Sequence, residues 1–253
     1  PRERQSAAHP PRQHVMADAW PAAVYAVGDV HGSLSQLQRM HEAIAQDAVF
    51  IDGPKWIVML GDYIDRGPDS AGVLDFLLQA PPAGFTRINL AGNHEVMMLE
   101  YLDRPTVSHY WLDVGAEETL MSYGIDLNRL GDRNISMAQR RQMLDAYLPI
   151  EHKSLLESLP VSCSLPGLVL VHAGLKAHVA LADQLESDLL WMRYPDNDPG
   201  PQDTVVVHGH TPRAEPLVLA NRICVDTGAY ATGTLSAVRL TEASPPKFLQ
   251  ISC

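Results

Sequence analysis

The chain is poor in cysteine and has no long hydrophobic run, and these two absences exclude several classes of protein. It has three cysteines in 253 residues, none in a C-x-x-C pair, so it carries no disulfide framework and is typical of a reducing compartment. No apolar run reaches the ~18–20 residues that span a bilayer. Residues 1–20 also lack the apolar stretch of a signal peptide. We therefore expect a cytoplasmic protein without a membrane partner.

Positive charge is also scarce. Lysine and arginine together number 19 against 30 aspartates and glutamates, a formal net charge of −11. Nucleic-acid-binding domains usually carry a basic surface, so no nucleic-acid partner is expected. Residues 1–20 are rich in Pro, Arg, Gln, His and Ala, which predicts a poorly ordered tail. The remainder, 21–253, is long enough for one core, and we expect a single monomeric domain.

Two short apolar runs, at 24–27 and 56–60, and a third, mixed segment at 86–90 each end next to a glycine-containing loop. Runs of this length and composition predict buried strands. Apolar residues at helical spacing follow the first two runs, over 33–49 and 70–78. This alternation predicts βαβ units of an α/β fold, in which a functional site forms at the carboxyl ends of the strands.

The rest of the chain divides into a helical part and a strand-rich part. Residues 94–160 are mostly helical in pattern, and we interpret about 100–160 as a helical insert that either completes the core or contacts substrate. A helix is predicted at 181–191. Strands are predicted at 161–165, 168–172, 204–207, 217–219, 222–225, 234–240 and 247–251. The two parts together predict two sheets packed against each other.

Five short motifs place metal-type ligands directly after predicted strands. They are Gly-Asp-Val-His-Gly at 28–32, Gly-Asp-Tyr-Ile-Asp-Arg-Gly at 61–67, Gly-Asn-His-Glu at 92–95, Val-His-Ala-Gly at 171–174 and Val-His-Gly-His at 207–210. Asp29 and His31 are two residues apart in an extended loop, so both side chains can face one ion. One carboxylate, that of Asp62, can bridge two ions. The set predicts a two-metal centre.

Neutral ligands complete this centre. Asn93, His172 and His210 can bind the second ion. Mixed Asp, His and Asn ligation suits Mn²⁺, Fe or Zn²⁺ better than Ca²⁺, and we favour two Mn²⁺ ions. Water held between two such ions has a lowered pKa, which is what phosphoester hydrolysis requires. We therefore expect a two-metal phosphatase.

The motifs resemble those of the phosphoprotein-phosphatase branch of the calcineurin-like metallophosphoesterases. That family has the pattern GDxHG, GDxxDRG, GNHE, HAG and GH, and all five blocks occur here in this order between about residues 24 and 240. The stretches at 189–193 and 226–230 resemble bacterial and phage members. The resemblance implies a β-sandwich of two mixed sheets flanked by helices. Ala91 and the Asp-Thr-Gly-Ala-Tyr stretch depart from eukaryotic members, so their regulatory properties are not carried over.

The resemblance also implies residue roles. Asp29, His31 and Asp62 would hold the first metal, and Asp62, Asn93, His172 and His210 the second. His94 matches the general acid that protonates the leaving oxygen, and Asp65 would orient it. Arg66 and Arg193 match the phosphate-binding arginines. The implied mechanism is direct attack by metal-bridging hydroxide without a phosphoenzyme. Glu95 is interpreted only as a favourable acid in a helix first turn.

The favoured activity is hydrolysis of phosphoserine and phosphothreonine in proteins or peptides, extending to phosphotyrosine. A dinucleoside tetraphosphate hydrolase is the main alternative. Asp65 argues in part against it, because symmetrical hydrolases of that type usually lack this aspartate. An RNA-end or cyclic-phosphate activity is disfavoured by the acidic charge. The last alternative is a non-catalytic metal-binding scaffold, against which the intact His94, Asp65 and Arg66 argue.

Overall fold

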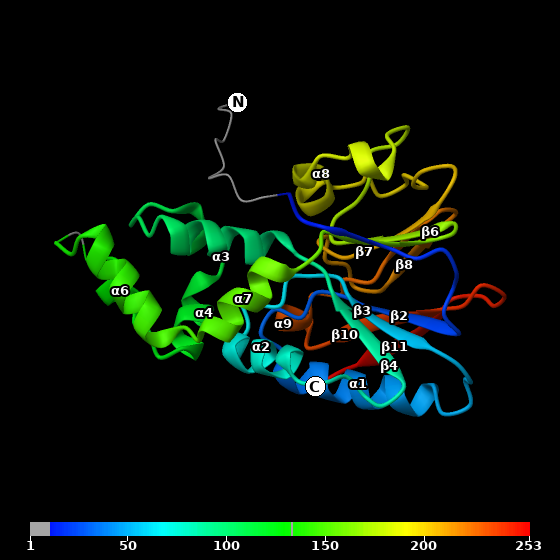
Figure 1. Cartoon of the computed structure of the whole chain (residues 1–253), viewed down its shortest axis with the longest axis horizontal. Helices are drawn as coiled ribbons and strands as arrows, with labels where there is room; N and C mark the ends of the chain where they lie inside the picture. Colours follow the sequence, from blue (N-terminus) through cyan, green and yellow to red (C-terminus); the bar gives the residue numbers. More distant parts are fainter. Residues whose placement is uncertain (1–10, 133) are drawn as a thin grey trace.

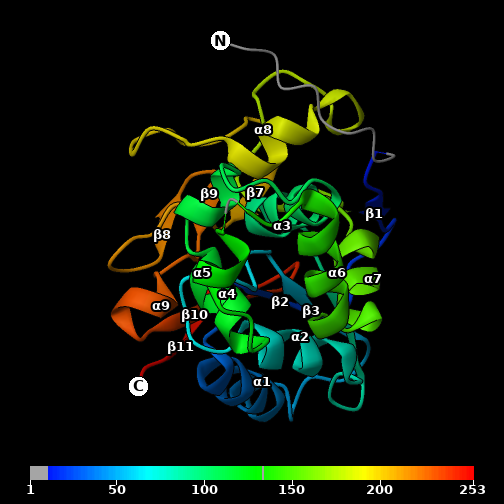
Figure 2. The same ribbon diagram turned by 90° about the vertical axis from the view of Figure 1, so that its left-hand side faces the viewer.

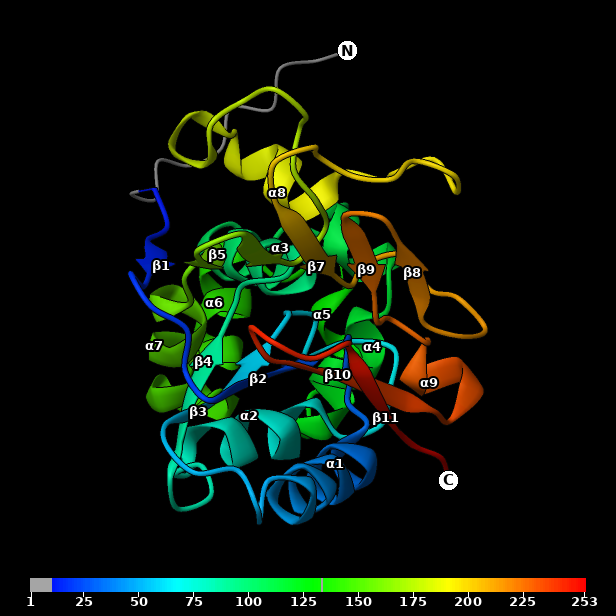
Figure 3. The same cartoon turned by 90° about the vertical axis from the view of Figure 1, so that its right-hand side faces the viewer.

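Two β-sheets lie face to face, and helices cover them from outside (Figure 1). The structure is a computed structural model that describes residues 11–132 and 134–253. Figure 3 shows one sheet above the other, with helices α1 (Leu34–Asp47) and α2 (Ser70–Leu78) beneath the lower sheet and α8 (Glu186–Trp191) above the upper one. The predicted α/β sandwich of two mixed sheets flanked by helices is confirmed.

The lower sheet contains the three strands predicted at 24–27, 56–60 and 86–90. Its order is β11-β10-β2-β3-β4. Strands β2 (Ala23–Val27), β3 (Lys55–Met59) and β4 (Phe85–Asn89) pair in parallel, and β10 (Leu235–Leu240) and β11 (Lys247–Ile251) add antiparallel pairs at one side. Because β2, β3 and β4 run in the same direction, the loops at their carboxyl ends meet at one edge.

The upper sheet has the order β1-β5-β6-β7-β9-β8. Its strands are β1 (His14–Met16), β5 (Ser162–Leu165), β6 (Leu168–Val171), β7 (Val205–His208), β8 (Leu217–Leu219) and β9 (Arg222–Cys224). β6, β7 and β9 are parallel. This second parallel set therefore delivers its own carboxyl-terminal loops to the site.

Strand β1 corrects the predicted tail. Residues 14–16 pair in parallel with β5, and the Val161 N–H donates to the Gln13 carbonyl at 2.9 Å. The strand covers an otherwise unpaired sheet edge. A run of only three residues, with His14 in it, gives no periodic signal. The part of the predicted tail at 1–10 lies outside the described residues.

The hydrophobic core forms two layers because side chains alternate along each strand. Val24 and Ala26 of β2 pack between the sheets, together with Leu170 and Val207 of the upper sheet. The alternate residues of β2 face the helices instead, and Tyr25 is an example.

The predicted helical insert is a cluster of short helices at one end of the sandwich (Figures 1 and 2). It follows α3 (Asn93–Asp103) and comprises η1 (Tyr110–Asp113), α4 (Ala116–Ser122), α5 (Leu127–Leu130), α6 (Met137–Tyr147) and α7 (Ile150–Ser158). The Ala91 N–H donates to the Pro160 carbonyl at 2.8 Å. The chain therefore leaves the sandwich and returns to it at nearly the same point.

One predicted helix needs correction, and one helix was not predicted. The segment 181–191 is not one helix but a short 3-10 helix, η2 (Leu181–Asp183), followed by α8. Gln184 and Leu185 between them have extended backbones, and the Gln184 amide nitrogen donates to the Lys176 carbonyl at 2.8 Å. A further helix, α9 (Ala229–Thr232), was not predicted. No helix among the described residues is long and apolar enough to cross a membrane.

Candidate metal centre

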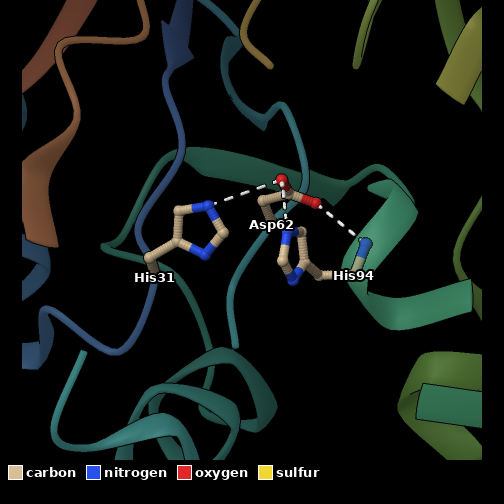
Figure 4. Close-up of side chains that lie close together, drawn as sticks. All are labelled: His31, Asp62 and His94. Carbon is tan, nitrogen blue, oxygen red and sulfur yellow. Dashed lines mark hydrogen bonds and ion pairs between the residues drawn. The ribbon is translucent and has the colours of Figure 1, made fainter. Parts of the chain in front are cut away.

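The predicted ligands gather where the parallel strands of both sheets end, with Asp62 at the centre. Asp62 Oδ2 lies 3.5 Å from His31 Nε2 and 3.9 Å from His94 Nε2 (Figure 4). Its other oxygen, Oδ1, lies 3.5 Å from His172 Nε2. Two groups of side chains therefore could each hold an ion and share Asp62. They are His31, Asp62 and His94 in one, and Asp62, His172 and His210 in the other.

The imidazoles are oriented so that electron pairs face inward. His31 Nδ1 lies 2.7 Å from the Ile64 carbonyl and His172 Nδ1 2.9 Å from the Leu60 carbonyl. A carbonyl oxygen only accepts, so Nδ1 carries the hydrogen in both rings and Nε2 presents a lone pair. His172 Nε2 is also 2.9 Å from Asn93 Oδ1 and 3.1 Å from His210 Nδ1. Such converging acceptors fit a cation, with the backbone carbonyls fixing the ligands.

Glycine allows the loops to pack tightly around the carboxylates. A Cβ at Gly92 would lie 2.2 Å from Asp62 Oδ1, and one at Gly209 would lie 2.0 Å from Asp29 Oδ1. Asp62 and His210 themselves adopt positive φ, at 51° and 65°. Left-handed backbone at non-glycine residues is costly and persists where surrounding contacts hold it.

Buried negative charge is concentrated here. Burial, followed by the Asp226 and Asp62 carboxylates, raises the pKa of Asp29 well above its usual value. Burial also raises the pKa of Asp226, to about 6. Burial opposes ionisation of Asp62, but the surrounding histidines, His172 first, lower its pKa. A bound cation would offset the unfavourable burial of several carboxylates.

Three of the histidines, His31, His172 and His210, are in contrast held in their neutral form. Burial lowers the pKa of His31 to about 3 and that of His210 to about 2. Burial also lowers the pKa of His172. Neutral imidazole is the form that binds metal ions, so these three side chains fit the group that the ligand pattern implies.

Asp29 occupies a different position from the other predicted ligands. Its carboxylate accepts from the backbone N–H of His210, at 3.0 Å and 3.2 Å, and it belongs to neither of the two groups defined above. It is nevertheless buried and interacts electrostatically with Asp62. The structure thus places Asp29 beside the two groups of metal-type ligands and in neither of them.

The two predicted phosphate-binding arginines line one small cavity. This cavity of about 80 Å³ is lined by Arg66 and Arg193 and by three of the predicted ligands, Asp62, Asn93 and His210. Its other lining residues are His94, Met97, Tyr110, Val114 and Trp191. Arg66 Nη1 donates to His31 Nε2 at 3.0 Å. Arg193 is exposed, and its Nη1 donates to the His210 carbonyl at 3.3 Å.

His94 and Asp65 form a buried pair at the same cavity. His94 Nδ1 donates to Asp65 Oδ2 at 2.5 Å, which leaves Nε2 on the side of Asp62. Burial lowers the pKa of His94, but the Asp62 and Asp65 carboxylates outweigh it and raise the pKa overall. The predicted contact between Asp65 and His94 is present.

Glu95 connects two ligand loops, a role that its position in the sequence does not indicate. Its fully buried carboxylate accepts from the backbone N–H groups of Asp62, Tyr63 and Gly92, at 2.9, 2.7 and 2.8 Å. It therefore ties the loop after β3 to the loop after β4, so the interpretation as a simple first-turn acid was incomplete. Burial raises its pKa to about 7, and the Asp62 carboxylate adds to this.

Tyr230, Trp111 and Thr119 were not assigned firm roles from the sequence. Tyr230 of α9 lies under the Arg66 guanidinium at 5.1 Å and against the edge of the His31 ring at 5.2 Å. Trp111 and Thr119 of the insert donate to Asp65. No metal-binding motif contains any of the three. Tyr230 lies in the Asp-Thr-Gly-Ala-Tyr stretch at 226–230, which drew notice only through its resemblance to bacterial and phage members.

Comparisons with known proteins agree with this geometry. Residues 22–235 match the family model described as calcineurin-like phosphoesterase. The chain is similar to an asymmetrical bis(5′-nucleosyl)-tetraphosphatase, PrpE, of Anoxybacillus flavithermus, at 25% identity over 85% of this chain and 89% of that protein. It is also similar to serine/threonine-protein phosphatase 2 of Escherichia coli K12, at 27% identity over 86% and 92% of the two chains.

Solved structures show the same fold. The crystal structure of a putative diadenosine tetraphosphatase superposes with a TM-score of 0.64 at 21% identity, and the match covers 95% of this chain and 97% of that one.

Proposed function

The chain belongs to the calcineurin-like phosphoesterase family, and from this premise we propose that it is a metal-dependent phosphomonoesterase acting on phosphoserine and phosphothreonine side chains of proteins. Phosphotyrosine is an expected secondary substrate. The observation that carries the proposal is the shared cavity: His94, Arg66 and Arg193 line the same small space above Asp62. A proton donor and two guanidinium groups therefore face the position where a phosphoryl group fits.

Two divalent ions fit the ligand set. Asp29, His31 and Asp62 would hold one ion, and Asp62, Asn93, His172 and His210 the other; Mn²⁺ is favoured, with Fe and Zn²⁺ as alternatives. The pair, when bound, supplies Lewis-acid stabilisation and a water of lowered pKa. The inward lone pairs of His31 and His172 are the structural support for this assignment.

Side chains of the protein perform the remaining steps of the proposed reaction. Arg66 and Arg193 bind phosphoryl oxygens through their guanidinium N–H groups and fix the phosphorus above Asp62. As water adds its oxygen to phosphorus and releases one proton to solvent, the ester bond breaks and His94 passes its Nε2 proton to the leaving oxygen. Solvent then returns a proton to His94. Asp65 keeps the ring in the tautomer and orientation for this transfer through its bond to Nδ1.

A dinucleoside tetraphosphate hydrolase is the second candidate, and two observations favour it. One of the similar proteins is named as an asymmetrical tetraphosphatase. In addition, Tyr110 and Trp191 line the cavity, and aromatic rings of this kind can stack against a nucleobase. Asp65 argues only against the symmetrical hydrolases, so it leaves this candidate in place.

One experiment separates the two candidates. The protein is depleted of metal, reloaded with Mn²⁺, and assayed with a phosphothreonine peptide and diadenosine tetraphosphate side by side. We expect faster turnover of the peptide, and faster cleavage of the dinucleotide would overturn this assignment. His94→Asn serves as the control, because loss of turnover in this variant ties the measured rate to this site.

A further inference from the structure

The carboxylate of Asp65 is held at the reaction centre by side chains of the helical insert. Asp65 is fully buried. Its Oδ2 accepts from His94 Nδ1 at 2.5 Å and from Trp111 Nε1 at 2.7 Å, and its Oδ1 accepts from Thr119 Oγ1 at 2.7 Å. Two of these three donors therefore come from the insert, from η1 and α4.

The hydrogen on the Thr119 hydroxyl can be placed by elimination. Thr119 Oγ1 accepts from the Asp65 backbone N–H at 2.8 Å, so its single hydrogen is free to donate to Asp65 Oδ1. In the 2.9 Å contact between Ser70 Oγ and Thr119 Oγ1, the Ser70 hydroxyl must then be the donor. Thr119 thus binds both the backbone and the side chain of Asp65.

The insert also supports the backbone turn that carries Asp65. Asp65 and Arg66 have positive φ, at 74° and 66°, a conformation that non-glycine residues rarely adopt. The Arg66 N–H donates to the Gly115 carbonyl at 3.0 Å. A Cβ at Gly115 would lie 2.7 Å from Arg66 Cγ. Three positions of the insert therefore fit closely around two residues of the turn.

We propose that Trp111 and Thr119 are positioning residues for the proton transfer, acting through Asp65 on His94; this rests on the phosphoesterase function proposed above. A carboxylate with one partner can rotate, whereas one held by three donors has a fixed plane. The plane of Asp65 sets the ring of His94, and the ring sets the direction of Nε2. Small misplacement of a reacting group costs up to about a hundredfold in rate.

This proposal makes a specific chemical prediction. The alkoxide released from phosphothreonine is strongly basic and needs a proton as it leaves. The nitrophenolate released from p-nitrophenyl phosphate is weakly basic and needs little help. Loss of His94 positioning should therefore slow peptide turnover selectively, whereas a general defect in folding or metal binding should slow both substrates together.

The test compares kcat for the phosphothreonine peptide and p-nitrophenyl phosphate on the Mn²⁺-loaded full chain. We expect Trp111→Phe and Thr119→Val each to lower kcat for the peptide about tenfold or more and kcat for the nitrophenyl ester less than about threefold. Thr119→Ser keeps the hydroxyl and should restore the ratio. Equal losses on both substrates, or no loss on either, would overturn the proposal.

Tyr101→Phe is the matched control. Tyr101 is buried and lies against Trp111, with ring centroids 5.2 Å apart, but its hydroxyl has no hydrogen-bond partner among the described residues. Removing that hydroxyl changes the same aromatic cluster without touching Asp65. Both kcat values should stay as in the wild type.

A second readout does not depend on turnover. The His94 Nδ1 proton in its short bond to Asp65 should give a downfield NMR resonance, assigned by its loss in His94→Asn. We expect Trp111→Phe to shift or broaden this resonance and Tyr101→Phe to leave it unchanged. If the wild type cleaves neither substrate but the resonance moves in Trp111→Phe, the positioning role stands and the proposed function fails. A resonance that Trp111→Phe leaves unchanged would overturn the positioning role.

Discussion

The ligand loops and the helical insert contribute to the same centre in different ways. The ligand loops, at 28–32, 61–67, 92–95, 171–174 and 207–210, bring the electron-pair donors together around Asp62. The insert brings no predicted metal ligand, yet it holds Asp65 through two side chains. Metal binding needs several neighbouring ligands, so it produces short contiguous motifs in the sequence. Positioning of a side chain needs only isolated donors, so it leaves single residues scattered along helices.

The two regions are also held in place differently. The ligand loops follow buried parallel strands whose register is fixed by backbone pairing. Among its described residues the insert has no strand pairing with the sheets, and it is attached by single backbone bonds and by side-chain contacts. His152 of α7 is buried, with Nε2 3.0 Å from Asp75 of α2 and Nδ1 2.7 Å from the Tyr123 hydroxyl at the end of α4. We therefore expect changes in the loops to affect metal binding and changes in the insert to affect proton transfer or stability.

The largest effect should follow from a change at the centre of the loops. Asp62→Asn removes the charge shared by both groups, and we expect kcat/KM to fall by more than about a thousandfold, since metal ions contribute several kcal/mol to the transition state. Bound metal, measured by elemental analysis after gel filtration, should fall as well. Retention of both metal and turnover would remove Asp62 from its assigned role.

The second-largest effect is expected at His94, which lies in a ligand loop and bonds to the Asp65 carboxylate that the insert holds. His94→Asn should keep the bound metal but lower turnover of the phosphothreonine peptide at least about a hundredfold, the usual scale for a general acid. The loss should be much smaller for p-nitrophenyl phosphate. Unchanged peptide turnover would contradict the proton-donor role.

A smaller effect is expected at Glu95, which connects two ligand loops without reaching the cavity. Glu95→Gln leaves one of its backbone N–H partners without an acceptor, and we expect about 10–100-fold weaker Mn²⁺ binding. Calorimetric titration of the metal-free protein measures this. Glu117→Gln, an exposed first-turn acid in α4, is the control. Equal affinities would show that the loops hold their shape without Glu95.

The smallest effect concerns packing within the insert, between the end of α4 and α7. Tyr123→Phe removes the hydroxyl that contacts His152 and should lower the free energy of unfolding by about 1 kcal/mol, as measured by urea denaturation. Mn²⁺ affinity should not change, because Tyr123 contacts neither group of metal-type ligands. A change in metal affinity as large as that of Glu95→Gln would remove the distinction between the two regions.

The sequence predicts the regular parts of the fold well, for a physical reason. Residues 24–27 and 56–60 are buried on both faces of a sheet, so they form unbroken apolar runs. The start of α2 was predictable to within one residue, because Asp69 and Ser70 both precede a helical apolar pattern and both can cap a helix. In the structure the cap is Asp69, whose side chain accepts from the Gly72 N–H at 2.8 Å. Strand β1 and helix α9 are too short for any periodicity to be visible.

The candidate site likewise has residues that the sequence predicts and residues that it does not. The metal-type ligands are adjacent to glycines in short motifs, so most of them can be identified from the sequence. The Trp111 and Thr119 donors reach Asp65 from 46 and 54 residues away, and such contacts depend on tertiary packing. The left-handed backbone of Asp65 and Arg66 is likewise set by partners distant in the sequence, and no local pattern indicates it.

The bond between the Ala91 N–H and the Pro160 carbonyl has a consequence for how such proteins diversify. It closes the excursion at its base, so the length and helix content of the excursion can change without altering the register of the sheets. A foreign helical cap could be grafted between the end of α3 and Pro160, so that Asn93, His94 and Glu95 are kept, provided that it restores the donors to Asp65. The two donor side chains are then the requirement on the new cap, and its remaining surface is free to adapt to a new substrate.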